Sequence, residues 1–132
     1  MIISWADLEV LARTLYGEAR GEMPLGKRAV AHVIFNRLQH APRFGSTIAE
    51  VCQQPWQFSC WLPSDPNSAV IKAATISQLA DCIVAAVEAI EEDDFTKGST
   101  HYYADTMTPP KWAAGHVPVV TIGHHRFFND VN

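Results

Sequence analysis

A helix that is apolar around most of its circumference is the feature that most restricts the fold of this chain. The stretch from about residue 24 to residue 39 includes "KRAVAHVIFNRL", in which apolar residues fall on several faces instead of forming one stripe. A helix of this kind has to be covered by neighbouring elements on several sides. We therefore expect it to be the central core helix. Its apolar positions are Ala29, Val30, Val33, Ile34 and Leu38.

An amphipathic helix is expected ahead of it, from about residue 5 to residue 16. Ser4 and Asp7 have the spacing of a capping box, with Asp in place of Glu, and apolar residues then recur every three or four positions. Gly17 and Gly21 disfavour continuation of a helix. The sequence therefore predicts that this helix ends before the glycines.

Two more helices are expected in the middle of the chain. "GSTIAEVC" carries a capping-box pattern at Thr47 and Glu50, which predicts a short helix. A proline-rich loop follows, from about residue 53 to residue 67. "ISQLADCIVAAVEAIEE" then has apolar residues at spacings of three and four, which predicts a long helix, with a start as early as Ser68 left open.

The C-terminal third has the composition of strands. "THYYA" and "VPVVTIGHHRFF" are rich in β-branched and aromatic residues, with proline and glycine between them. A small antiparallel sheet or hairpin packed on the helices fits this pattern. We expect one mostly α-helical, α+β domain that comprises residues 1–132.

The charge pattern makes DNA or RNA an unexpected partner. The formal net charge is −4, and the ten Lys and Arg residues are scattered, so a field that would attract phosphate is missing. No apolar run approaches the roughly 20 residues that span a bilayer, and the first residues do not read as a signal peptide. We therefore expect no membrane insertion and no export signal. Cys52, Cys60 and Cys82 lack metal-type spacing and are expected to be buried thiols.

Two acidic residues stand four positions apart in "YGEARGE", after the first helix. Glu18 would lie at the C-terminal end of that helix, where free carbonyl groups raise the pKa of a carboxyl group. If the backbone stays helical, like-charge repulsion from Glu22 acts in the same direction. A carboxylic acid that stays neutral near physiological pH suits general acid catalysis. The alternative is a solvated turn with Arg20 as a surface counter-ion.

Six histidines raise the question of a metal site. Four of them lie in the C-terminal third, without an HExxH or similar ligand spacing, and the adjacent His124 and His125 would point to opposite faces of a strand. We expect no metal ion and no other cofactor. A serine or cysteine nucleophile is also not indicated, because GxSxG is missing and Cys60 has no activating partner nearby in sequence.

Aromatic residues gather in "QPWQFSCWLP", in "HYYAD" and at Trp112. Exposed aromatic rings bind the apolar faces of sugars. For each ring, burial in the core is the alternative. Trp56, between Pro55 and Gln57 in a loop, is the ring that we most expect at the surface. The polar residues that would supply hydrogen bonds are Gln57, Ser59, His101 and Asp105.

Taken together, these segments resemble the SleB-type family of cell wall hydrolases, which includes spore cortex-lytic enzymes and many phage and prophage proteins. The resemblance is carried by "LARTLYGEARGE", "GKRAVAHVIFNRL", "VCQQPWQFSCW", "THYYAD" and "TIGHHRFF", in the order of the family. It implies a lysozyme-like, lytic-transglycosylase-like fold and cleavage of peptidoglycan between N-acetylmuramic acid and N-acetylglucosamine. The catalytic acid of the family matches Glu18.

Further roles follow from the resemblance and from position in the sequence. The residues expected to bind the glycan are Trp56, Gln57, Phe58, Ser59, Tyr102 and Tyr103. The residues expected in supporting roles are Glu22, His101 and Asn36. Glu22 is assigned to orienting its loop or Arg20. Asn36 and Arg37 also have a plainer explanation, as capping and dipole partners at the end of the central helix.

The expected reaction is that of a lytic transglycosylase with one catalytic acid. If the Glu18 carboxylate takes a proton from the muramic C6 hydroxyl, a 1,6-anhydro sugar forms; if it activates water, an ordinary reducing end forms. The sequence leaves these two products open. A glycan-binding or structural virion module without turnover, and a zinc-dependent amidase, are the alternatives to a glycosidase.

The resemblance also leads to an expectation about the biological setting. "HYYADTMTPPKW" resembles the phage-type branch of the family. This favours a phage or prophage endolysin that stays in the host cytoplasm until a holin releases it, or a protein carried with the virion. Peptidoglycan glycan strands are the expected partner, and a monomer is expected.

Overall fold

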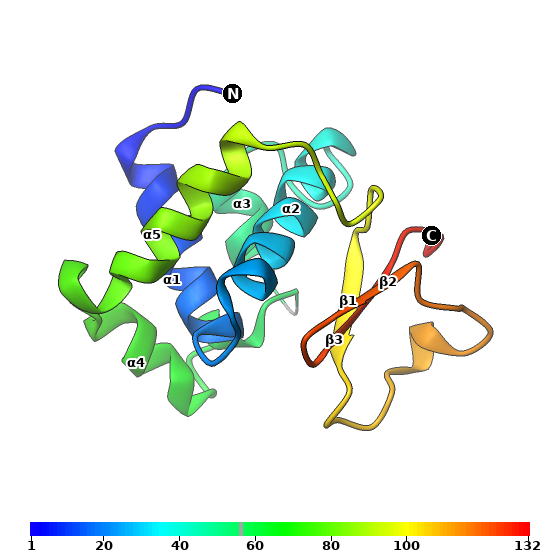
Figure 1. The fold of residues 1–132 in the computed structure, drawn as a ribbon. Coiled ribbons are helices and arrows are strands. Elements are labelled where there is room, and N and C mark those ends of the chain that lie inside the picture. Colours follow the sequence, from blue (N-terminus) through cyan, green and yellow to red (C-terminus); the bar gives the residue numbers. More distant parts are fainter. Residues whose placement is uncertain (56) are drawn as a thin grey trace.

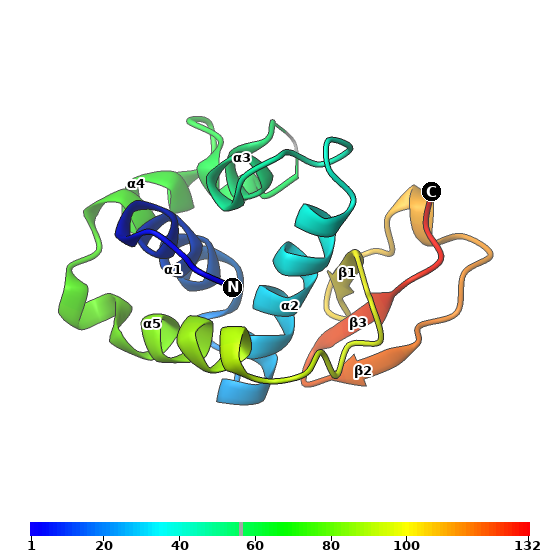
Figure 2. The same cartoon turned by 90° about the horizontal axis from the view of Figure 1, so that it is seen from above.

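The computed structural model describes residues 1–55 and 57–132. Helices make up one part of the molecule, and a small sheet lies beside α2 (Figure 1; Figure 2). The predicted mostly α-helical fold with a small C-terminal antiparallel sheet is confirmed. In chain order the elements are α1 (Trp5–Ala19), α2 (Pro24–Gln39), α3 (Ile48–Gln53), the 3-10 helix η1 (Ser59–Trp61), α4 (Pro66–Ala73), α5 (Ile76–Glu91), β1 (His101–Ala104), the 3-10 helix η2 (Lys111–Ala113), β2 (Val120–Ile122) and β3 (His125–Phe128).

The helix α2 is the centre of the fold and has the predicted bounds. It begins with Pro24, whose fixed φ suits the first turn of a helix. Val30 and Ile34 pack with α1, α3 and α5 in the main hydrophobic cluster, while Ala29 and Val33 pack against the sheet. The helix is therefore covered on both sides, as its apolar sequence requires.

The helix α1 runs further than predicted, through Gly17 to Ala19. The prediction treated Gly17 as a helix breaker, whereas the structure uses it as a close-packing position. A Cβ atom on Gly17 would lie 2.6 Å from Cβ and 2.8 Å from Sγ of Cys60 in η1. The extra residues include Glu18, which lies in the last turn of α1, at the C-terminal end of the helix as predicted, and is partly buried.

Two separate helices form in the region where the sequence left open a single long helix that starts as early as Ser68. Asp65 caps α4 at Pro66, and α4 ends at Ala73. Thr75 and Gln78 then form a complete capping box that starts α5, bent by 92° from α4. Within the described residues, no single helix has the length and apolar composition needed to cross a membrane; α4 and α5 meet that criterion as a bent pair, on length and composition alone.

Within the described residues, the sheet has three antiparallel strands in the order β1–β3–β2. Tyr102 pairs with Phe127 and Tyr103 with Arg126, so the two adjacent tyrosines face opposite sides of the sheet. Tyr102 packs toward α2, and Tyr103 packs against Phe128 on the other face. Cys52, Cys60 and Cys82 are buried free thiols, as expected from the sequence.

Replacement of Gly17 by alanine tests the close packing of α1 on η1. The added methyl group would overlap Cys60, and overpacking of this kind costs about 1–3 kcal/mol of unfolding free energy. Urea denaturation should show that loss. Gly21→Ala is the matched control, because no atom lies within 4 Å of its added Cβ. Equal stability of the two variants would contradict this packing.

Candidate active site

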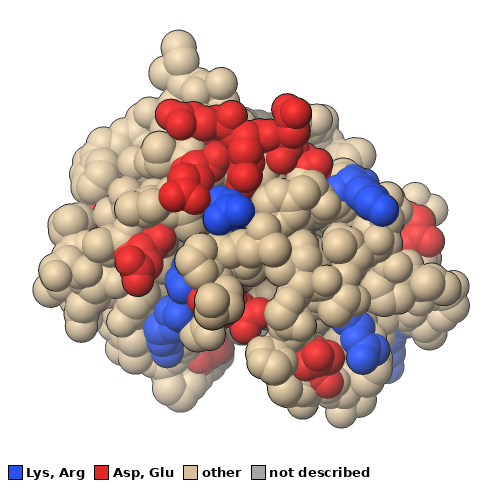
Figure 3. All heavy atoms as spheres, in the orientation of Figure 1, with Lys and Arg blue, Asp and Glu red and all other residues tan. Residues whose placement is uncertain are grey.

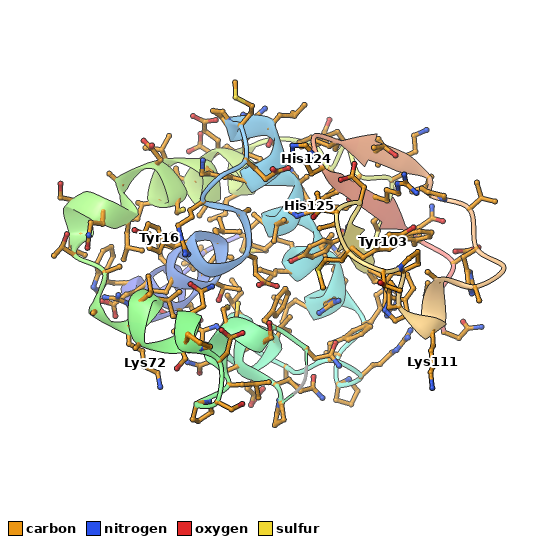
Figure 4. All side chains as sticks on the ribbon, turned by 90° about the horizontal axis from the view of Figure 1, so that it is seen from below. Tyr16, Lys72, Tyr103, Lys111, His124 and His125 are labelled. Atoms are coloured by element: carbon orange, nitrogen blue, oxygen red, sulfur yellow. The ribbon has the colours of Figure 1, made fainter. Side chains whose placement is uncertain are left out.

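A cavity of about 540 Å³ lies between the helical part and the sheet. The surface is hollowed between these two parts (Figure 3), and Tyr103 and His125 come from the sheet side of the opening (Figure 4). It draws residues from α1, the end of α2, the start of η1 with the two residues before it, the sheet, and η2 with the segment before it. The lining residues are Glu18, Arg37, Gln57, Phe58, Ser59, His101, Tyr102, Tyr103, Ala104, Met107, Pro110, Trp112 and His125.

Glu18 is the carboxylic acid of this cavity. It is partly buried in the last turn of α1, and among the described lining residues no other carboxyl group is present. The Tyr102 hydroxyl donates a hydrogen bond to Glu18 Oε1 at 3.1 Å. The helical part thus supplies the acid, and the sheet supplies a donor that fixes its orientation.

Burial raises the pKa of Glu18 above its ordinary value. The Tyr102 hydrogen bond and the positive charge of Arg37 act against this rise, and the negative charge of Asp65 adds to it. The rise is in the predicted direction, and burial is its main cause. Desolvation of the carboxyl group, rather than repulsion from Glu22, favours the neutral acid.

Tyr102 is held as a neutral hydroxyl donor. Burial and the nearby Glu18 raise the pKa of Tyr102 well above its usual value. Its ring lies 5.0 Å from the ring of His125 and 5.6 Å from that of Phe127, centroid to centroid. Packing of the ring on both neighbours restricts the direction in which its hydroxyl points.

Residues 57–59, which lead into the start of η1, reach the cavity. Gln57, Phe58 and Ser59 all line it, whereas Trp56 lies outside the described residues. Phe58 is buried, and its ring lies 5.0 Å from the guanidinium carbon of Arg37. Phe58 therefore supports the floor of the cavity, and Gln57 and Ser59 are the polar groups of this segment.

His101, Tyr103 and Trp112 form an aromatic wall opposite the helices. The ring of His101 lies 5.1 Å from that of Trp112, and the ring of Tyr103 lies 6.0 Å from it. Burial lowers the pKa of His101 to about 4, with help from the positive charges of Arg37 and Arg43. His101 is thus neutral at physiological pH, and its ring is suited to packing and to neutral hydrogen bonds.

Glu22 lies apart from the acid, at the turn between β2 and β3. Its Oε1 accepts a hydrogen bond from the backbone N–H of His124 at 3.1 Å and lies 3.9 Å from Nδ1 of His125. A Cβ on Gly123 would lie 2.5 Å from the same oxygen, so only glycine allows this approach. Glu22 therefore fastens the hairpin to the start of α2. The assignment of Glu22 to orienting Arg20 is wrong, because Arg20 contacts other groups.

Arg20 and Asp105 differ from the roles that the sequence indicated. Arg20 donates to Asn67 Oδ1 at 3.0 Å. Asp105 lies 3.5 Å from Nδ1 of His124 and does not line the cavity, among the residues that are described. His124 and His125 point to opposite faces, as predicted: the His124 side chain is 70% exposed and that of His125 is 7% exposed.

Asn36 supports a neighbouring loop and is not one of the described residues around the cavity. Its amide donates to Asp94 Oδ2 at 2.9 Å and to the Ser99 carbonyl at 3.0 Å. The loop leads directly into β1. Asn36 therefore positions the strand that carries Tyr102. Its role is to support the site indirectly, through that strand.

Arg37 is the site residue that the sequence reading did not propose. It is 5% exposed, and its Nε donates to the Thr100 carbonyl at 2.7 Å. The explanation as a partner of the helix dipole is insufficient, because the side chain lies inside the cavity wall. A signal was available: an arginine within a helix that is apolar on nearly every side has to be buried.

Acidic side chains gather near the end of α5 (Figure 3), but they serve the fold. Glu92 pairs with Arg28 at 2.9 Å and with His32 at 3.2 Å, and Asp94 accepts hydrogen bonds from its own loop. Among the described residues, no group of three His, Cys, Asp or Glu side chains has the arrangement of a metal site.

Comparison with known proteins identifies the family. The sequence matches the model of the cell wall hydrolase family over residues 21–128. The chain belongs to this family. The matched range begins just after Glu18, so the place of Glu18 in the site rests on the geometry described above.

Two curated relatives are similar to this chain over most of its length. The spore cortex-lytic enzyme of Bacillus subtilis is 35% identical over 126 residues, which are 92% of this chain and 37% of that protein. The spore cortex-lytic enzyme of Halalkalibacterium halodurans is 30% identical over 123 residues, or 93% of this chain and 34% of that protein. The chain thus spans little more than a third of the length of these relatives.

Solved structures have the same fold. The catalytic domain of the Bacillus cereus SleB protein superposes with a TM-score of 0.80 at 28% identity, covering 96% of this chain and 92% of that one. The catalytic domain of the germination-specific lytic transglycosylase SleB from Bacillus anthracis gives a TM-score of 0.75 at 28% identity, with 96% of each chain covered. The predicted SleB-type resemblance and lysozyme-like fold are confirmed.

Replacement of Gly123 by alanine tests the contact between Glu22 and the hairpin. Gly123 has a φ of +56°, so alanine there brings backbone strain as well as overlap with Glu22. Gly115→Ala shares the strain, at φ +81°, but has open space around the new Cβ. We expect thermal unfolding to show a further loss of about 1–3 kcal/mol for Gly123→Ala relative to Gly115→Ala.

Replacement of Tyr102 by phenylalanine tests the hydrogen bond to Glu18. Because this bond favours the carboxylate, its loss should raise the pKa of Glu18 further. The pKa is measured from the pH dependence of the carboxyl ¹³C shift in glutamate-labelled protein. Tyr103→Phe is the control and should leave that pKa where it is in the wild type. An unchanged Glu18 pKa in folded Tyr102→Phe protein would rule out the role given to this bond.

Proposed function

We propose that this chain cleaves the glycan strand of peptidoglycan between N-acetylmuramic acid and N-acetylglucosamine, as a lytic transglycosylase with Glu18 as its single catalytic acid. The observation that carries the proposal is a partly buried glutamic acid with a raised pKa, facing a cavity lined by aromatic and polar groups. The similar proteins, which are spore cortex-lytic enzymes and a germination-specific lytic transglycosylase, support the same activity.

In the first step, Glu18 acts as a general acid. Its proton passes to the glycosidic oxygen while the bond from that oxygen to the muramic C1 breaks, and C1 takes on oxocarbenium character. The N-acetylglucosamine side leaves with a free hydroxyl group. A neutral Glu18 is required at this point, and burial favours that form by raising the pKa of Glu18.

In the second step, the Glu18 carboxylate acts as a general base. It removes the proton of the muramic C6 hydroxyl as that oxygen bonds to C1, which gives a 1,6-anhydro sugar and restores the acid. No water is consumed and no second carboxylate is needed. The proposal is therefore consistent with a cavity in which Glu18 is the lone carboxylic acid among the described lining residues.

The glycan is proposed to lie along the cavity between the helices and the aromatic wall. Tyr103, His101 and Trp112 offer ring faces and edges to the sugars, and Gln57 and Ser59 offer hydrogen bonds. An alternating N-acetylated glycan suits such a surface, because each sugar has apolar faces and a ring of polar substituents. The surface thus combines contact area with a few directional polar groups.

We also propose a phage or prophage setting, in which the protein reaches peptidoglycan as an endolysin released through a holin or as part of a virion. The segment "HYYADTMTPPKW" supports this proposal by its resemblance to the phage-type branch. Expression in the cytoplasm of a host bacterium, with and without a co-expressed holin, tests it. Lysis that depends on the holin is the expected result, and lysis without any holin would contradict that route.

Replacement of Glu18 by glutamine tests the catalytic assignment. Products released from purified peptidoglycan are analysed by mass spectrometry, and the wild type should give muropeptides one water lighter than their reducing-end counterparts. Glu18→Gln should lower their release at least about a hundredfold. Glu91→Gln, at an exposed position at the end of α5, is the matched control and should keep wild-type activity.

The outcomes separate the proposal from its alternatives. Reducing-end muramic products would replace the transglycosylase reaction by hydrolysis, and new amino termini would indicate an amidase. Folding of Glu18→Gln is checked by its free energy of unfolding. The raised pKa of Glu18 determines in which direction the substitution changes that free energy. Wild-type stability from this group is full below the unfolded pKa and falls as pH rises through the folded pKa, so the uncharged glutamine variant should be at least as stable at neutral pH. Full lysis by folded Glu18→Gln would falsify the assignment.

A further inference from the structure

Arg37 carries a buried positive charge that no described residue balances. The side chain is 5% exposed, and among the described residues no carboxylate lies within ion-pair distance of it. Its Nη1 atom is buried without a hydrogen-bond partner in the described part of the chain. A guanidinium group stays protonated, and a buried charge without a partner lowers the stability of the fold. The presence of this charge in the cavity wall therefore needs an explanation.

The position of the guanidinium group is fixed by its surroundings. Its Nε donates to the Thr100 carbonyl at 2.7 Å, and its central carbon lies 5.1 Å from the ring of Phe44 and 5.0 Å from that of Phe58. Two aromatic rings and one hydrogen bond hold it without neutralising it. The charge is therefore preorganised, and its free N–H groups are available for a negative charge that appears only at certain times.

Glu18 is the acidic group that shares the cavity with Arg37. The two line the same space, and Tyr102, two residues after Thr100, donates to Glu18 from the strand that Arg37 anchors. Burial raises the pKa of Glu18 and so favours its neutral form, in which Glu18 offers Arg37 no negative charge. Once Glu18 has given up its proton, an anion and a cation occupy one low-dielectric cavity and stabilise each other.

We propose that Arg37 is the fixed countercharge of Glu18, a positioning residue that stabilises the carboxylate formed when Glu18 protonates the glycosidic oxygen. The inference rests on the proposed function, because it concerns the step in which Glu18 acts as an acid. The stabilisation is larger after proton donation than before it, and only such a difference increases the rate of the step. The proton moves from Glu18 to the departing oxygen, and Arg37 keeps its own protons throughout.

Other groups near Glu18 shift its balance between carboxylic acid and carboxylate, some toward one form and some toward the other. Asp65 opposes the carboxylate, while the Tyr102 hydroxyl favours it. Cys60 faces the same region but stays a thiol, because burial raises the pKa of Cys60 far above neutrality. His125 is held neutral, because burial lowers the pKa of His125. Arg37 is thus the cation whose charge acts on Glu18 in the described structure.

The test is a pH profile of Arg37 variants. Initial rates of anhydro-muropeptide release from purified peptidoglycan are measured for wild type, Arg37→Gln and Arg37→Lys. The rate falls as pH rises through the pKa of Glu18, since the acid must be protonated. Arg37→Gln should lower the maximal rate at least about tenfold and move this alkaline limb to higher pH, because the cation that favours the carboxylate is gone. Arg37→Lys keeps the charge, so its limb should stay near that of the wild type.

Arg43→Gln is the matched control. Arg43 also stacks on Phe44, at 4.5 Å, but it is exposed and its charge is not among those that act on Glu18. Its profile should match that of the wild type. A purely structural Arg37 would give Arg37→Gln a lower rate with an unmoved limb, and that result overturns the proposal.

Two further measurements test the proposal if Arg37→Gln does not fold or if the wild type releases no product. If Arg37→Gln does not fold, Arg37→Lys carries the test: loss of product in the folded lysine variant, with the limb unmoved, overturns a role for charge. If the wild type releases no glycan product, the proposed function fails. The pKa of Glu18, measured by ¹³C shifts in wild type and Arg37→Gln, then decides the pairing separately; a rise in the variant supports it, and no change overturns it.

Discussion

The burial of α2 on both of its sides is the constraint on which the site depends. One side of α2 holds α1 and α5, and the other side holds the sheet. The acid comes from the first of these groups and its hydroxyl donor from the second. A single helix therefore sets the distance across which Glu18 and Tyr102 meet, and its last turn adds Arg37 to the same space.

Desolvation gives the site its chemical character. Burial favours the neutral forms of Glu18, Tyr102 and His101, because it raises the pKa of the first two and lowers that of the third. Arg37 then dominates the local field, because in a cavity with little water a single charge is weakly screened. A site of this kind favours a reaction in which negative charge appears briefly on one group and is then removed.

The sequence predicted what local patterns determine and missed what distant contacts determine. The bounds of α2 followed from periodicity, and Thr47 is the predicted N-cap of α3, although the Glu50 side chain accepts from Ser46 and not from Thr47. Glu18 lies at the C-terminal end of α1, as its position in the sequence indicated. Gly17 was misread because its neighbour Cys60 is distant in sequence. The partner of Glu22 lies in a hairpin about a hundred residues later, so no local pattern could indicate it.

The division of the site between helices and sheet has a consequence for how the protein loses function. Small sheets at the edge of a helical core open at lower free energy than the core itself. Once the sheet separates, Glu18 loses the Tyr102 hydrogen bond and its dry surroundings, and it becomes an ordinary solvated carboxylate. The proposed activity therefore belongs to the docked state alone, because a copy whose sheet has separated keeps its helices but not the buried acid that the reaction needs.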